Sequence, residues 1–213
     1  MPYSHTTVTP QQVHILFWRL SETIDELIEL WGKEKYPQRY DSTMTEKRRC
    51  EIMATALLLR QHFGKDITIN YTTNGAPIID NGYISISHTA TYVVIAIHPL
   101  RPVGVDIETI GKKAVRVMER FLSPKEIAIL PTEENLLTCE TSYRTEAIHL
   151  AWSVKECIYK IHPSAIEFRK DIILSSFNTL PEGEVTAWLS NSNTTIQAFY
   201  TIHDGCSLAW ALL

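Results

Sequence analysis

Residues 103–109 are the stretch that most limits how this chain can fold. The positions 103, 105 and 107 are apolar, and Asp106 and Glu108 alternate with them. This two-residue period predicts a β-strand that buries its apolar face and turns both carboxylates to the same side. Two acids on one strand face repel each other, and Mg²⁺, which prefers oxygen ligands, would relieve that repulsion. The alternative is an ordinary solvated face of an antiparallel sheet, which requires no ligand.

In the first half of the chain, a helical pattern gives way to an alternating one. Apolar residues at helical spacing begin near Thr45 and end at about His62, before Gly64, a typical helix-ending residue. Residues 83–88 alternate, and residues 92–98 form an unbroken apolar run, so both predict strands. The first half therefore predicts a long helix followed by antiparallel strands.

The second half repeats this order, with a helix expected at about 145–161 and strands after it. The prediction is an α+β fold of two similar, pseudo-symmetric lobes. Each lobe would have a long helix packed on a small antiparallel sheet, with a ligand cleft between the lobes. Prolines 99 and 102 suggest a boundary that gives an N-terminal lobe of residues 1–101 and a C-terminal lobe of residues 102–213.

Composition excludes several classes of function. The chain has 213 residues, of which 45% are hydrophobic, and a net charge of −4. That charge argues against a general nucleic-acid surface. The four cysteines form no C-x-x-C pair, which favours a reducing cytoplasm over a disulfide or zinc framework. The N-terminus lacks a signal-peptide pattern, and no apolar run approaches the ~18 residues of a membrane span. We therefore expect a cytoplasmic protein without nucleic-acid or membrane partners.

The expected long helix carries the residues that complement the acidic strand. Trp152, Glu156 and Lys160 are spaced i, i+4 and i+8, so they share one helix face. One interpretation is an exposed Glu–Lys pair, worth ~0.2–0.5 kcal/mol. The other is that Glu156 joins Asp106 and Glu108 in a three-carboxylate Mg²⁺ site, where Lys160 would hold a metal-bound phosphate.

Further candidates for binding a phosphorylated ligand lie elsewhere in the chain. Lys155 is about 100° around the helix from Glu156 and could serve a second ligand group. Arg48 and Arg49 could clamp a phosphate, although such a basic run is often only solvated surface. His88 ends the strand at 83–88, where a histidine is often a surface or capping residue. Gly75 permits close backbone approach to a ligand.

The order of these motifs resembles that of the 4′-phosphopantetheinyl transferase superfamily over roughly residues 45–165. The motifs that carry the resemblance are Gly75-x-Pro77, Ser87-His88, Gly104-Val-Asp106-Ile-Glu108, Phe121-x-x-x-x-Glu126 and Trp152-x-x-Lys155-Glu156-x-x-x-Lys160. The length and the doubled pattern are similar to those of the Sfp type, which is a monomer with two related halves. The lysine often found in the first motif is Ala76 here, which removes one phosphate contact.

The resemblance implies a defined reaction. The phosphopantetheine arm of coenzyme A would move to a serine of an acyl or peptidyl carrier protein, releasing adenosine 3′,5′-bisphosphate. Asp106, Glu108 and Glu156 would bind Mg²⁺ together with the coenzyme A pyrophosphate. Glu156 would also take the serine proton, directly or through a water, and Lys160 would neutralise charge on the pyrophosphate.

The resemblance also implies contacts to coenzyme A and to the carrier protein. The implied coenzyme A contacts are Arg48 or Arg49, Gly75, Pro77, Ser87, His88, Asp106, Lys155 and Lys160, with His88 at the 3′-phosphate. Residues 112–121, which contain four basic side chains, are the candidate docking rim for an acidic carrier protein, or else an ordinary exposed helix. Two competing functions are a non-catalytic binder of coenzyme A or a carrier protein, and an unrelated Mg²⁺-dependent phosphohydrolase.

Overall fold

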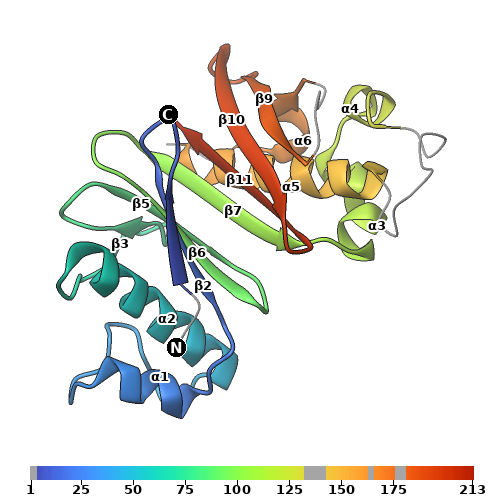
Figure 1. The fold of residues 1–213 in the computed structure, drawn as a ribbon. Helices are drawn as coiled ribbons and strands as arrows, with labels where there is room; N and C mark the ends of the chain where they lie inside the picture. The colour runs from blue at the N-terminus through green and yellow to red at the C-terminus, as the bar shows by residue number, and fades with distance from the viewer. Residues whose placement is uncertain (1–3, 132–142, 163–165, 176–180) are drawn as a thin grey trace. The chain divides into compact units, whose positions relative to one another are not determined.

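A computed structural model describes residues 4–131, 143–162, 166–175 and 181–213 (Figure 1). By its internal contacts, the chain divides into two compact units, Met1–Arg101 and Pro102–Leu213. Each unit combines helices with an antiparallel sheet, which confirms the α+β class. Among the described residues, no helix combines the length and the apolar character needed to cross a membrane.

Unit 1 is built on a four-stranded antiparallel sheet with the strand order β1-β2-β6-β5. The strands are β1 (Ser4–Val8), β2 (His14–Arg19), β5 (Tyr83–His88) and β6 (Tyr92–His98). Every residue of β6 is buried, as expected for its unbroken apolar sequence in the sheet interior. A short hairpin of β3 (Asn70–Tyr71) and β4 (Pro77–Ile78) lies outside this sheet.

Helix α2 (Glu46–Phe63) packs on β2 and β6 of the unit 1 sheet, and α1 (Ile24–Trp31) packs against α2. The Thr45 side chain accepts a hydrogen bond from the Arg48 backbone N–H, so the start of α2 is capped. Gly64, in the left-handed conformation at φ 68°, ends α2 as the sequence predicted. The core of this unit includes Leu27 on α1, Met53 on α2 and Ile95 on β6.

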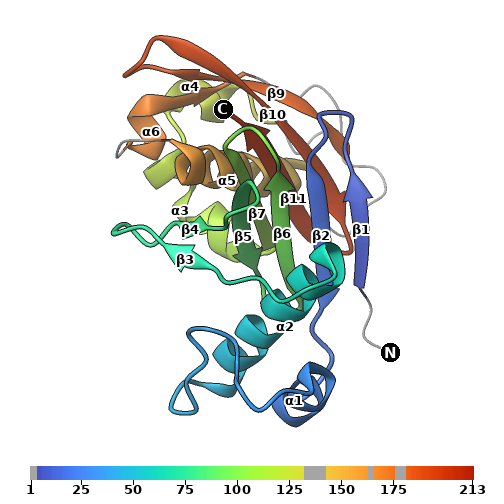
Figure 2. The same ribbon diagram turned by 90° about the vertical axis from the view of Figure 1, so that its left-hand side faces the viewer.

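Unit 2 is built on a five-stranded antiparallel sheet with the order β7-β11-β10-β9-β8. The strands are β7 (Val103–Thr109), β8 (Ile172–Leu174), β9 (Glu182–Leu189), β10 (Thr194–His203) and β11 (Cys206–Leu212). The helices are α3 (Lys112–Phe121), α4 (Pro124–Ala128), α5 (Tyr143–Ile161) and α6 (Phe168–Asp171). The long helix α5 packs on β7, β11 and β10 (Figure 2). It buries Ile148, Val154 and Ile158 in the core of this unit.

The two units share a long helix on an antiparallel sheet but differ in sheet size and strand order. Their pseudo-symmetry therefore stays a prediction. Cys50, Cys157 and Cys206 are buried free thiols, and Cys139 lies outside the described residues.

Candidate functional site

The first group of candidate residues is a carboxylate cluster in unit 2, made of Asp106 and Glu108 on β7 and Glu156 and Lys160 on α5. Gly104 allows these two elements to approach closely. A Cβ atom at Gly104 would lie only 2.0 Å from the Cys157 carbonyl oxygen, so the α5 backbone rests directly on β7. This contact places Glu156, the neighbour of Cys157, next to the acidic strand.

Lys160 connects the two elements of the cluster. Its Nζ donates to Asp106 Oδ1 at 2.7 Å and to the Val105 carbonyl oxygen at 2.9 Å. Asp106 is only 4% exposed, so a solvated strand face does not describe this position. Lys160 therefore forms an ion pair between α5 and β7. The sequence alone had left open a different pair, an exposed one between Lys160 and Glu156 on the same helix.

The remaining acids of the cluster repel one another in a partly buried environment. Burial raises the pKa of Glu156 to about 7, repulsion from Asp106 and Glu108 adds to the shift, and Lys160 opposes it. Burial and then the Asp106 charge also raise the pKa of Glu108, while a hydrogen bond from Trp152 lowers it. Trp152, which shares a helix face with Glu156, is thus a polar partner of Glu108.

Whether this cluster suits Mg²⁺ depends on its donor chemistry and its spacing. In the part of the chain that the structure describes, no three His, Cys, Asp or Glu residues are arranged to hold a metal ion. The donors are nevertheless carboxylate oxygens, which Mg²⁺ prefers. A divalent cation would also stabilise the ionised forms of Glu108 and Glu156, whose pKa values are raised. The donor chemistry fits Mg²⁺, and the ion itself stays a prediction.

Lys155, the neighbour of Glu156, is not part of the carboxylate cluster. Its side chain is buried and forms an ion pair with Glu126 on α4. A phosphate contact would require an exposed donor, so Lys155 is not included among the phosphate contacts proposed below.

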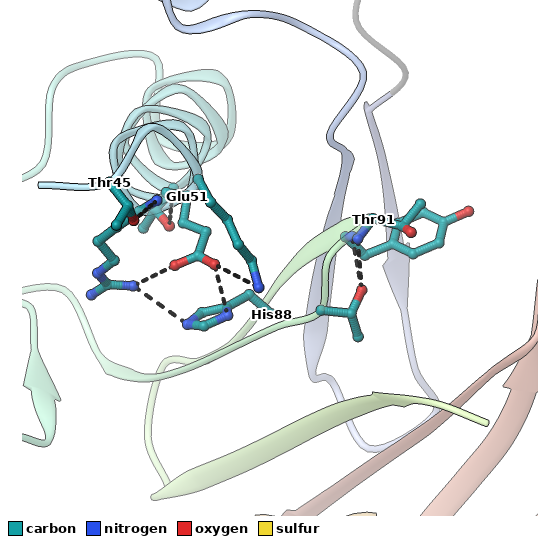
Figure 3. A network of polar contacts seen from close by, with 9 residues as sticks. Thr45, Glu51, His88 and Thr91 are labelled. Carbon is teal, nitrogen blue, oxygen red and sulfur yellow. Dashed lines mark hydrogen bonds and ion pairs between the residues drawn. The ribbon is translucent and has the colours of Figure 1, made fainter. Parts of the chain in front are cut away.

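A second group of candidate residues lines a pocket in unit 1, which we call the arginine–histidine pocket. Glu51 on α2 points toward His88 at the end of β5 (Figure 3). Glu51 Oε2 accepts a hydrogen bond from Arg48 Nη1 at 2.8 Å, and Glu51 Oε1 lies 3.2 Å from His88 Nδ1. Arg48 Nη1 also lies 3.4 Å from His88 Nε2. The two nitrogen-bearing side chains therefore converge on one side of the pocket.

Most of the residues that line this pocket were not predicted, and three of them, Glu51, Arg39 and Tyr71, make contacts through charged or aromatic groups. Glu51 is 4% exposed and pairs with both Arg48 and Lys47 on its own helix. Its spacing from these cations, i−3 and i−4, was a signal available in the sequence. The Arg39 guanidinium lies 4.1 Å from the centre of the Tyr71 ring, and both residues line the pocket. These two residues come from separate segments, so no local pattern relates them.

Only some of the other residues predicted to contact coenzyme A belong to this pocket. Arg48 lines it, whereas Arg49 is not among its lining residues. Ser87 is buried and, by strand alternation, projects from the face of β5 opposite His88. Gly75 has φ 82° and forms the turn between β3 and β4, and Pro77 pairs with Tyr71 across that hairpin. The hairpin thus contributes to the pocket through Tyr71.

Unit 2 thus carries the carboxylate cluster, and unit 1 carries the arginine–histidine pocket. The family model of the 4′-phosphopantetheinyl transferase superfamily matches residues 102–210, slightly over half of the chain. The chain belongs to this superfamily.

Two curated proteins of Bacillus subtilis are similar to the chain. A 4′-phosphopantetheinyl transferase is 27% identical over 84 residues, which cover 39% of this chain and 34% of that protein. The 4′-phosphopantetheinyl transferase Sfp, from strain 168, is 24% identical over 149 residues, which cover 68% of this chain and 62% of that protein. The matches thus span less than two thirds of either relative.

Proposed function

We propose that this protein transfers the phosphopantetheine arm of coenzyme A to a serine hydroxyl of an acyl or peptidyl carrier protein. The serine oxygen forms a bond to phosphorus, and the phosphoanhydride bond breaks to release adenosine 3′,5′-bisphosphate. The observation that carries this proposal is the carboxylate cluster, because all four of its residues lie in the segment matched by the family model.

In this proposal, Asp106, Glu108 and Glu156 would hold Mg²⁺, and the ion would supply positive charge near the pyrophosphate. Lys160, oriented by Val105 and Asp106, supplies a second positive charge close to the developing negative charge. Glu156 would accept the serine proton, directly or through a water, and a cation bound beside it would favour the ionised carboxylate that a base requires. Phosphoryl transfer depends mainly on such positioning and charge neutralisation.

The arginine–histidine pocket is proposed to bind the 3′-phosphate of coenzyme A. Arg48 and His88 both line it and lie 3.4 Å apart, so they can donate to one phosphate. We assign this contact to Arg48 rather than Arg49, because Arg48 lines the pocket and Arg49 does not. The Gly75–Pro77 turn approaches the same ligand through the hairpin that carries Tyr71.

Helix α3 is the proposed docking surface for the carrier protein. It buries Ala114 and Phe121 against unit 2 and exposes its basic residues, which are Lys112, Lys113, Arg116 and Arg120. Exposed positive charge on one helix suits an acidic partner and would increase the association rate. A monomeric, cytoplasmic enzyme of the Sfp type, with two similar halves, belongs to the same proposal.

A direct assay tests this function. The purified chain is incubated with coenzyme A, Mg²⁺ and a panel of apo carrier proteins, and mass spectrometry measures addition of the arm. Glu156→Gln should abolish the mass gain without unfolding the chain, whereas Glu146→Gln on the same helix serves as the matched control. Full activity of Glu156→Gln would remove this carboxylate from the mechanism.

The competing functions give different results in the same assay. Coenzyme A bound without turnover on any carrier would indicate a non-catalytic binder. Phosphate released from simple nucleotides, without a carrier protein, would indicate a phosphohydrolase.

A further inference from the structure

A buried ion pair lies beside the carboxylate cluster and has no role in the function proposed above. Lys155 on α5 and Glu126 on α4 are 0% and 3% exposed, and Lys155 Nζ lies 2.7 Å from Glu126 Oε1. Both residues belong to motifs that the sequence singled out, yet both side chains are almost fully buried. Their burial calls for a different role.

The pair joins several segments of unit 2. Lys155 Nζ also donates to the carbonyl oxygens of Phe121, at 2.8 Å, and of Phe168, at 2.9 Å. These are the last residue of α3 and the first residue of α6. All three hydrogens of the ammonium group therefore have acceptors within the protein.

The Glu126 carboxylate is held as fully as its partner. Its Oε1 accepts the backbone N–H of Leu174 on β8 at 3.0 Å, and its Oε2 accepts the backbone N–H of Ser123 at 2.7 Å. The second contact is part of a capping box that begins α4. The pair thus fixes α5 relative to the segments that contribute α3, α4, α6 and β8.

Stability alone does not account for such a pair. Desolvation of two buried charges offsets most of their attraction, and apolar replacements of similar volume are often neutral or stabilising. What an ion pair with five directed hydrogen bonds supplies is a defined geometry. On α5 that geometry fixes the rotation of the helix, because Lys155 projects about 100° away from its neighbour Glu156.

We propose that Lys155 and Glu126 are positioning residues, which hold α5 in the rotation that directs Glu156 toward Asp106 and Glu108. This inference rests on the function proposed above and deepens it. It replaces a direct phosphate contact of Lys155 with an indirect role, in which the lysine acts through Glu156.

The test compares Lys155→Met, Glu126→Gln and the double variant that carries both substitutions. Each single variant leaves one buried charge without its partner and can unfold the chain, so the double variant, with a neutral pair, is the decisive one. Lys125→Met replaces an exposed lysine next to Glu126 and is the matched control. Thermal melts and near-UV circular dichroism establish that each variant is folded.

For the double variant we expect kcat to fall about 100-fold, as a displacement of about 1 Å can cause. The KM for coenzyme A should stay within about twofold, since no phosphate contact is lost. Mn²⁺ binding, measured by electron paramagnetic resonance as a probe for the Mg²⁺ site, should weaken about 10–100-fold, the range for loss of an orienting partner. The effects of the two single substitutions should be far from additive.

Three outcomes would overturn the proposal. A double variant with wild-type kcat and Mn²⁺ affinity would show that the pair positions nothing. A raised KM for coenzyme A with unchanged kcat would show that Lys155 contacts the phosphate. A double variant that does not fold would assign the pair to stability alone. If the wild-type chain modifies no carrier protein, the proposed function fails, and Mn²⁺ affinity still tests the positioning role.

Discussion

The substitution Gly104→Ala tests how closely β7 and α5 must approach for the carboxylate cluster to form. The added Cβ atom would lie 2.0 Å from the Cys157 carbonyl oxygen and 2.9 Å from Ile161 Cγ2. Ordinary contacts begin at 3.4 Å, and 3.4 minus 2.0 leaves a required shift of about 1.4 Å. Because the closest obstacle is backbone, no rotamer change relieves it, and the helix must move away from the strand.

The expected cost of Gly104→Ala follows from this displacement. Overpacking in a core typically costs 1–3 kcal/mol, and a clash between backbones belongs at the upper end, about 3 kcal/mol. For a chain of this size that corresponds to a fall in Tm of roughly 6–12 °C. The same shift separates Glu156 from Asp106, and a misplacement of about 1 Å can lower the rate about 100-fold. We therefore expect folded protein with strongly reduced transfer.

The assay combines a thermal melt with the carrier-modification measurement. Gly111→Ala is the control, because a Cβ atom there has no neighbour within 4 Å among the described residues. It should leave both Tm and activity within experimental error of the wild type. A Gly104→Ala variant with wild-type Tm and activity would refute the close-approach explanation for this glycine.

Three further predictions concern other parts of the molecule. His88→Ala should raise the KM for coenzyme A about tenfold and leave that for 3′-dephospho-coenzyme A nearly unchanged, the loss of one charged hydrogen bond of ~1.5 kcal/mol; equal effects would show that His88 does not contact the 3′-phosphate. Arg116→Glu on α3 should raise the KM for the carrier protein but not that for coenzyme A, and insensitivity of both would exclude α3 as the docking surface. Burial lowers the pKa of His149 below its usual 6.5, so the unfolded chain binds more protons and stability should fall as the pH drops below about 6.5. Thermal melts between pH 8 and pH 5 should show a smaller loss for His149→Gln, and an identical loss would contradict this assignment.

Local patterns were sufficient for much of the fold. The two-residue period of residues 103–109 predicted β7, and apolar spacing with Gly64 predicted the extent of α2. By contrast, the amino-terminal strand β1, Ser4–Val8, is mostly exposed, so it has no apolar alternation from which it could be predicted. It becomes a strand by pairing with β2, which is a contact between segments.

The candidate site, like the fold, could be predicted only where it depends on local sequence patterns. Asp106, Glu108 and Glu156 could be selected from the sequence, because their spacing places acids on one strand face and one helix face. Glu51 and the Arg39–Tyr71 contact were not predicted, since they depend on which segments meet around the pocket. Residue type identified candidates, whereas their partners could be assigned only from the folded chain.

By itself, the sequence determined the α+β class, the motif order and the acidic residues on β7 and α5, since these depend on residues close together in the chain. Only the tertiary structure decided that Lys160 pairs with Asp106 and that Lys155 is buried against Glu126. Neighbouring residues on a helix project about 100° apart, so Lys155 and Glu156 enter different environments. Which environment each one meets depends on long-range packing, and adjacent residues in one motif can therefore have entirely different roles.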